Sequence, residues 1–173
     1  GKGVGTIVML LLILFGAYYF ASYLTSKGSA GHEAAGESMN AAYSNTPAAK
    51  LAIYSAGMAY LNLKDYNKAI YYLDQFEGDD VLLSALSKGS IGDAFVEIGQ
   101  LDDAFDYYIQ ASKVNENLFS TPKYLYKAAI TASKIGKINQ SIDLLKKIKK
   151  DFPESEQSDY VEVQIGRLET SLK

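Results

Sequence analysis

One pattern of small and large residues occurs three times along the chain, and this repeat constrains the fold more than any other feature. Small residues inside a first expected helix are Gly57, Gly92 and Ala129. Small residues inside a second expected helix are Ala69, Ala104 and Ser141. Both series advance by 35 and then 37 residues. Since small residues let two antiparallel helices approach closely, the chain is expected to fold into stacked helical hairpins.

Larger side chains and turn residues follow the same spacing. Three places after the first series come Tyr60, Phe95 and Ala132, and four places after the second come Leu73, Tyr108 and Leu145. Gly99 and Gly136 fall in the expected turns, where the left-handed conformation ends a helix. Thr121 and Pro122 are expected to begin the third unit as N-cap and first helical residue.

This pattern resembles the tetratricopeptide repeat (TPR), a helix–turn–helix unit of about 34 residues. The resemblance covers residues 50–153, and Pro153 occupies the place of the repeat's terminal proline. The usual tryptophan is replaced by Ile53, Lys88 and Leu125. A last helix over residues 157–172 is expected to close the open end of the stack through Tyr160, Val163 and Leu168.

The N-terminal part of the chain is long and apolar enough to cross a membrane. No charged residue lies between Lys2 and Lys27, and residues 4–24 would span roughly 31 Å as a helix. Aromatic residues gather at one end of this segment, as they do at a membrane interface: Tyr18, Tyr19, Phe20 and Tyr23. One lysine flanks the segment on each side, Lys2 and Lys27, so the flanking charges do not decide its orientation in the membrane.

A cleaved signal peptide is the alternative interpretation of this segment. The most apolar run, residues 7–15, is short enough for the core of a signal peptide, and residues 28–30 could serve as a cleavage site. The segment is retained in the chain, which favours a single transmembrane helix. The expected fold is therefore all-α: a single N-terminal transmembrane helix, then a TPR-type α-solenoid of about three hairpins and a C-terminal capping helix.

Composition suggests three parts with different roles. Residues 1–27 are interpreted as the membrane anchor, and residues 48–173 as the TPR domain. Residues 28–47 are rich in Gly, Ser, Ala and Asn, which is typical of a linker, and residues 33–43 could form a short helix.

No catalytic or metal-binding pattern rises above background. Cysteine is absent, and the only histidine, His32, lies in the linker with Glu33 and Glu37 nearby, too few ligands for a metal site. The clustered carboxylates at residues 77–80 lack the spacing of a calcium loop. We therefore expect a protein that is not an enzyme and needs no cofactor. The formal net charge of −3 gives no reason to expect nucleic-acid binding.

Charge is distributed unevenly along the expected repeats. Residues 74–106 contain nine acids and one base, and residues 113–150 contain nine lysines and two acids. The favoured interpretation is two solvated surfaces that attract one another within the fold. The alternative is a dipolar surface that orients a charged partner.

TPR stacks usually bind peptides or partner helices along a groove formed by the first helix of each repeat. The register assigns to this groove Tyr54, Met58, Leu61, Asp93, Val96, Tyr126 and Ile130. Packing between neighbouring helices is the alternative role for these side chains. Tyr54 and Met58 stand where chaperone-binding TPR proteins carry the Lys and Asn that clamp a terminal carboxylate, so that ligand is not expected.

The order of anchor, linker and repeats, together with the repeat sequences from residues 54 and 88, resembles the YfgM-like ancillary subunits of the bacterial Sec translocon. The resemblance implies a single-pass protein of the bacterial inner membrane with its TPR domain in the periplasm. The implied partners are a SecYEG-type channel, a PpiD-type periplasmic chaperone and translocating clients. Two alternatives stay open: a structural subunit of another envelope complex, such as a secretion or motility machine, and a self-assembling TPR oligomer.

Overall fold

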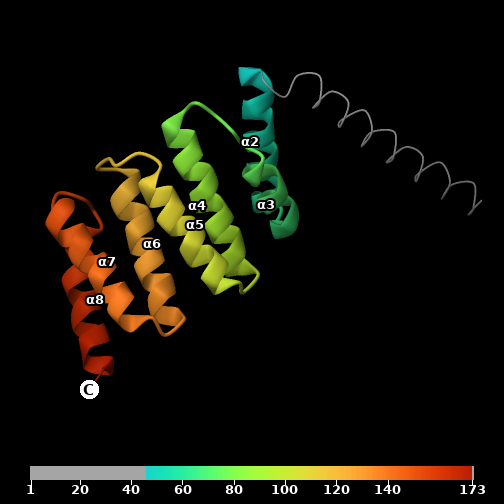
Figure 1. The fold of residues 1–173 in the computed structure, drawn as a ribbon. Helices are drawn as coiled ribbons and strands as arrows, with labels where there is room; N and C mark the ends of the chain where they lie inside the picture. The colour runs from blue at the N-terminus through green and yellow to red at the C-terminus, as the bar shows by residue number, and fades with distance from the viewer. Residues whose placement is uncertain (1–45, 173) are drawn as a thin grey trace, which may run out of the picture. The chain divides into compact units, whose positions relative to one another are not determined.

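Three helical hairpins followed by a single helix make up the described part of the chain, residues 46–172 of a computed structural model (Figure 1). The hairpins are α2 (Pro47–Asn62) with α3 (Tyr66–Asp74), α4 (Val81–Glu97) with α5 (Leu101–Lys113), and α6 (Ser120–Lys134) with α7 (Ile138–Asp151). The last helix is α8 (Ser158–Ser171). Each helix lies beside the next one in the sequence, so the hairpins stack in chain order as the repeat predicts.

Contact between the two helices of each hairpin depends on the predicted small residues. A Cβ atom on Gly57 would lie 2.5 Å from Cγ of Leu73, and one on Gly92 would lie 2.6 Å from Cε1 of Tyr108. In the third hairpin, Ser141 Oγ donates a hydrogen bond to the carbonyl oxygen of Ala129 at 2.7 Å. The register predicted from the repeat is therefore confirmed.

Two apolar clusters hold the later repeats together. One joins α4, α5 and α6 and contains Ala85, Ala104, Phe105, Tyr108, Ala111, Tyr124, Ala128 and Ala132. The other joins α6, α7 and α8 and contains Leu125, Ala129, Leu145, Ile148, Phe152 and Val161. Because each cluster includes residues from two successive units, the core runs along the stack and holds its repeats in a fixed order.

The three turns inside the hairpins share one backbone geometry. Gly99 and Gly136 have positive φ angles of 79° and 78°, as predicted, and Lys64 has 60° at the equivalent place. The amide of Lys64 donates to the carbonyl of Leu61 at 3.0 Å, a bond of the kind that ends a helix. The first turn thus places a side chain where the other two place glycine.

The capping helix is present, but the face that it buries was predicted wrongly in part. Leu168 packs on the second cluster as expected, together with Val161 and Ile165. Tyr160 and Val163 are instead 55% and 57% exposed. This helix has two apolar stripes: Val161, Ile165 and Leu168 form one, and Tyr160 and Val163 form the other. Only the stripe that contains Val161 packs against the rest of the fold.

The start of α6 also differs from the prediction. The helix begins at Ser120, so Thr121 and Pro122 lie within its first turn and do not cap it. The N-cap residue is Phe119, and the turn before the helix is held by Asn117, whose Oδ1 atom accepts hydrogen bonds from the amides of Phe119 (2.8 Å) and Ser120 (2.7 Å).

None of the helices between residues 46 and 172 is long and apolar enough to cross a membrane. The predicted membrane segment, residues 4–24, lies outside the described residues, as do His32 and the linker helix expected over residues 33–43.

Candidate functional site

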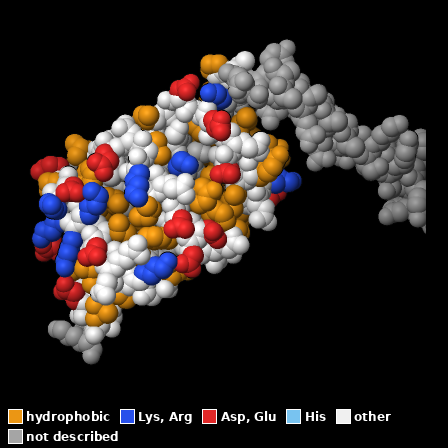
Figure 2. All heavy atoms as spheres, in the orientation of Figure 1, with side chains coloured by type: hydrophobic (Ala, Val, Ile, Leu, Met, Phe, Trp, Pro, Cys, Tyr) orange, Lys and Arg blue, Asp and Glu red, His pale blue; other side chains and the backbone are white. Residues whose placement is uncertain are grey.

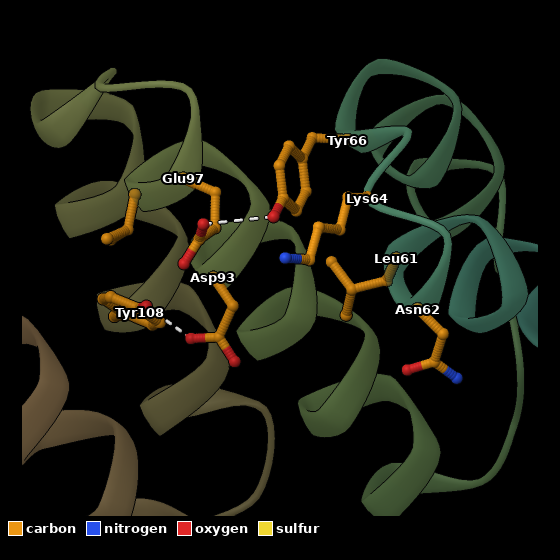
Figure 3. A pocket seen from close by; sticks show the side chains of 8 residues that line it. Leu61, Asn62, Lys64, Tyr66, Asp93, Glu97 and Tyr108 are labelled. Carbon is orange, nitrogen blue, oxygen red and sulfur yellow. Dashed lines mark hydrogen bonds between the residues drawn. The ribbon is translucent and has the colours of Figure 1, made fainter.

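A hollow of about 430 Å³ lies between the first and second hairpins and is the strongest candidate for a binding site (Figure 3). Its lining comes from the end of α2, the turn after it, the start of α3, and the facing sides of α4 and α5. The residues are Leu61, Asn62, Lys64, Tyr66, Asp93, Val96, Glu97 and Tyr108. Apolar and charged side chains are mixed in it, as they are in sites that bind protein segments.

The structure brings three of the seven predicted groove residues together in this hollow: Leu61, Asp93 and Val96. All seven are half-buried. Tyr54 packs against Phe76, with ring centroids 5.4 Å apart, and Tyr126 packs on the second apolar cluster. The other four, Tyr54, Met58, Tyr126 and Ile130, lie on the first helices α2 and α6 but do not line the hollow.

Asp93 is already bonded within the fold. The Tyr108 hydroxyl donates to its Oδ1 atom at 2.5 Å, and Lys127 Nζ donates to both oxygens, at 2.6 and 2.8 Å. Burial, and then the hydrogen bond to Asp93, raises the pKa of Tyr108 far above its ordinary value. Asp93 therefore fixes α4 to α5 and α6, and its carboxylate is engaged before any partner arrives.

Glu97 lies one helical turn after Asp93 and has a different environment. Its side chain accepts one hydrogen bond, 3.1 Å from the Tyr66 hydroxyl, and is exposed. Desolvation, the hydrogen bond and the negative charge of Glu97 raise the pKa of Tyr66. Figure 3 shows the Lys64 side chain directed into the same hollow. Glu97 thus keeps acceptor capacity for a donor from a partner, because a carboxylate has about four lone-pair sites.

Sequence reasoning missed five lining residues: Asn62, Lys64, Tyr66, Glu97 and Tyr108. Lys64 and Tyr66 belong to the turn region of the first hairpin, and Tyr108 belongs to a second helix, whereas the prediction used only first helices. One available signal was the position of Glu97, four residues after Asp93, because residues four apart share a helix face.

Two partly exposed ion pairs join the acidic and basic blocks of the sequence. Lys127 bonds Asp93, and Lys137 Nζ donates to Asp102 at 2.9 Å. These pairs confirm, for the four residues concerned, that the blocks attract one another within the fold. Figure 2 shows basic and acidic side chains interspersed over α7 and α8, beside an apolar region on the middle of the same face.

The stacked hairpins, with the hollow between the first two, define an α-solenoid of the kind that binds other proteins. Comparison with known families agrees with this class, because the tetratricopeptide repeat family matches residues 51–78 and 123–155. The matched segments contain most of the first hairpin and of the third, which supports a TPR-containing protein. No curated protein matches the chain.

Proposed function

We propose that the protein is a non-enzymatic scaffold that binds a segment of a partner protein in the hollow between its first two repeats. The observation that carries this proposal is the pairing of apolar Leu61 and Val96 with the exposed carboxylate of Glu97. A segment with an apolar residue beside a lysine or arginine fits these groups, since the apolar side chain contacts Leu61 and Val96 while the cation contacts Glu97.

A scaffold suits the described residues better than an enzyme does. One of the two carboxylates in the hollow, Asp93, is held by Lys127 and Tyr108 and would act as a structural group. Residues 46–172 contain no group of three or more side chains that could hold a metal ion. TPR domains typically act by binding other proteins, and we extend that role to this chain.

We place the scaffold at the bacterial inner membrane, with residues 4–24 as a single-pass anchor and the TPR domain in the periplasm. The support for this part is the uncharged N-terminal stretch and the resemblance to YfgM-like subunits. On that basis the partners are a SecYEG-type channel, a PpiD-type chaperone or emerging clients. A structural subunit of another envelope complex is the alternative.

Photo-crosslinking of the full chain in bacterial membranes tests the binding site. A photoreactive amino acid at Val96, inside the hollow, is compared with one at Gln140, on the exposed surface of α7. We expect partner adducts at Val96 and few at Gln140, and Glu97→Lys is expected to reduce the Val96 adducts because it reverses the charge that holds the cation. Equal adducts at both positions would overturn the assignment of the hollow.

The same experiment separates the proposed partners. Adducts to translocon subunits or a periplasmic chaperone support the Sec-associated scaffold, and adducts to one component in fixed stoichiometry support a structural subunit. Fractionation and protease access of intact cells test the location. If the repeats resist the protease as cytoplasmic proteins do, the periplasmic placement is overturned. The proposal that the hollow binds a partner would still stand.

A further inference from the structure

The first helix of the stack, α2, has one exposed face, which we call the outer face of α2. This face includes Leu63, the residue directly after the helix. Its members share an exposed side chain that is small or uncharged: Ala48, Leu51, Ala52, Ser55, Ala59, Asn62 and Leu63. Leu51 is 52% exposed and Leu63 is 75% exposed. The one charged residue of α2, Lys50, pairs with Asp79 at 3.7 Å. A helix that is apolar on nearly all sides normally has its faces buried.

Two of the equivalent positions in the second repeat are buried under a neighbouring helix. Ala52 and Ala59 correspond by register to Ser87 and Ala94 in α4, which are 2% and 0% exposed. α4 packs against α3, and in the same way α6 packs against α5. Between residues 46 and 172 no helix precedes α2, so Ala52 and Ala59 are exposed at positions that a neighbouring helix covers in the second repeat. Leu63 corresponds to Ile98, which is also exposed.

Large residues at both ends and small residues in the middle make one row on the outer face of α2 complementary to the same row in the reverse direction. Leu51, Ser55, Ala59 and Leu63 follow one another at intervals of four residues and form a stripe roughly 18 Å long. In an antiparallel pair of such stripes, Leu51 meets Leu63 of the other copy and Ser55 meets its Ala59. Contact between identical surfaces requires this reciprocity, and the small central residues allow the helices to approach closely.

Polar chemistry does not oppose such a contact. The Ser55 hydroxyl donates to the carbonyl oxygen of Leu51 at 2.8 Å, so it brings no unpaired donor into an interface. With no charge on the outer face of α2, two copies meet there without like-charge repulsion. We propose that two copies of this chain form a symmetric dimer through antiparallel pairing of their α2 helices.

Cysteine cross-linking tests the antiparallel geometry, and the absence of native cysteine makes single-cysteine variants clean probes. Full-length Leu51→Cys and Leu63→Cys chains are prepared separately, mixed, and treated with a short bis-maleimide. We expect cross-linked dimers in the mixture and little product in either variant alone, because identical positions lie at opposite ends of the pair. Product from each single variant alone, or no product in the mixture, would overturn the proposed pairing.

Charge variants test whether this face drives the association. Ser55→Glu and Ala59→Lys are each expected to abolish the dimer measured by light scattering. An equimolar mixture of the two variants should restore it, because the introduced carboxylate of one chain then faces the introduced ammonium group of the other. Gln140→Glu adds a negative charge on the exposed surface of α7 and is expected to leave the dimer intact. A monomeric parent chain, or a dimer that survives Ser55→Glu, would overturn the proposal, and the latter result would assign association to another surface or to residues before Pro47.

Discussion

Lys127 of α6 reaches across the stack and donates hydrogen bonds to both carboxylate oxygens of Asp93 on α4, at 2.6 and 2.8 Å. The hydroxyl of Tyr108, on α5, donates to the same carboxylate. A single acid therefore joins three helices from two successive repeats. The ion pair is partly exposed, whereas the tyrosine ring is buried, so the two contacts should differ in their contribution to stability.

Replacing Asp93 should separate these contributions. Asp93→Ala removes the acceptor of the buried Tyr108 hydroxyl and is expected to cost about 1–3 kcal/mol. Asp93→Asn retains an oxygen acceptor and loses mainly the partly exposed ion pair, so the expected cost is under about 1 kcal/mol. Urea unfolding of the full chain followed by circular dichroism measures both. Equal losses in the two variants would show that the charge matters more than the hydrogen bond.

Glycine-to-alanine substitutions should have opposite effects at equivalent helical positions. Gly57→Ala and Gly92→Ala place a Cβ atom against Leu73 and Tyr108, and each is expected to destabilise the fold by about 1–3 kcal/mol. Gly166 holds the equivalent place in α8, where a Cβ atom would meet nothing within 4 Å. Gly166→Ala should therefore stabilise the fold by about 1 kcal/mol, because alanine is the better helix former. Thermal unfolding of the three variants checks the order, which a stabilised Gly92→Ala chain would contradict.

The helices and their register could be predicted from the sequence because the small residues recur at the points where helices touch. Gly92 packs on Tyr108, and both were part of the repeat pattern. The lining of the candidate hollow was harder to predict from the sequence. Asp93 was assigned to the groove without its bond to Lys127, since ion pairing between residues 34 positions apart depends on how successive repeats are stacked.

The face of α8 shows a second limit of sequence reasoning. Both stripes of α8 contain large apolar or aromatic side chains, Tyr160 and Val163 on one and Val161 and Ile165 on the other, so hydrophobic periodicity alone did not choose between them. The repeat register, in contrast, does distinguish the buried stripe from the exposed one. Val161 follows Tyr124 by 37 residues, and Tyr124 occupies the side of α6 that packs against the preceding hairpin. Extending the register beyond the third repeat would have identified the buried stripe.

The turn of the first hairpin should become more stable with glycine. Lys64 has a φ angle of 60°, where a Cβ atom is disfavoured, and the equivalent turns contain Gly99 and Gly136. Lys64→Gly is expected to raise the free energy of unfolding by about 0.5–1 kcal/mol, and Gly99→Ala to lower it by about 1 kcal/mol. Chemical denaturation compares the two. A loss of stability in Lys64→Gly would show that the lysine side chain makes a contact worth more than the strain.

Tyrosine ionisation should make the fold sensitive to alkaline pH. Burial, and then the hydrogen bond to Asp74, raises the pKa of Tyr107 to about 12, and burial also raises the pKa values of Tyr108 and Tyr124. In the unfolded chain tyrosine titrates near pH 10, so above that pH the unfolded state releases protons that the folded state retains. Stability from this source is complete below about pH 10 and is lost as the pH rises toward 12.

Unfolding midpoints measured between about pH 9 and 12 should fall steadily, and less steeply in Tyr107→Phe, which cannot ionise at this position. Asp74→Ala should give a partial reduction of the slope, because burial remains when the hydrogen bond is removed. A Tyr107→Phe chain with the parent's slope would show that Tyr107 ionises alike in the folded and unfolded states.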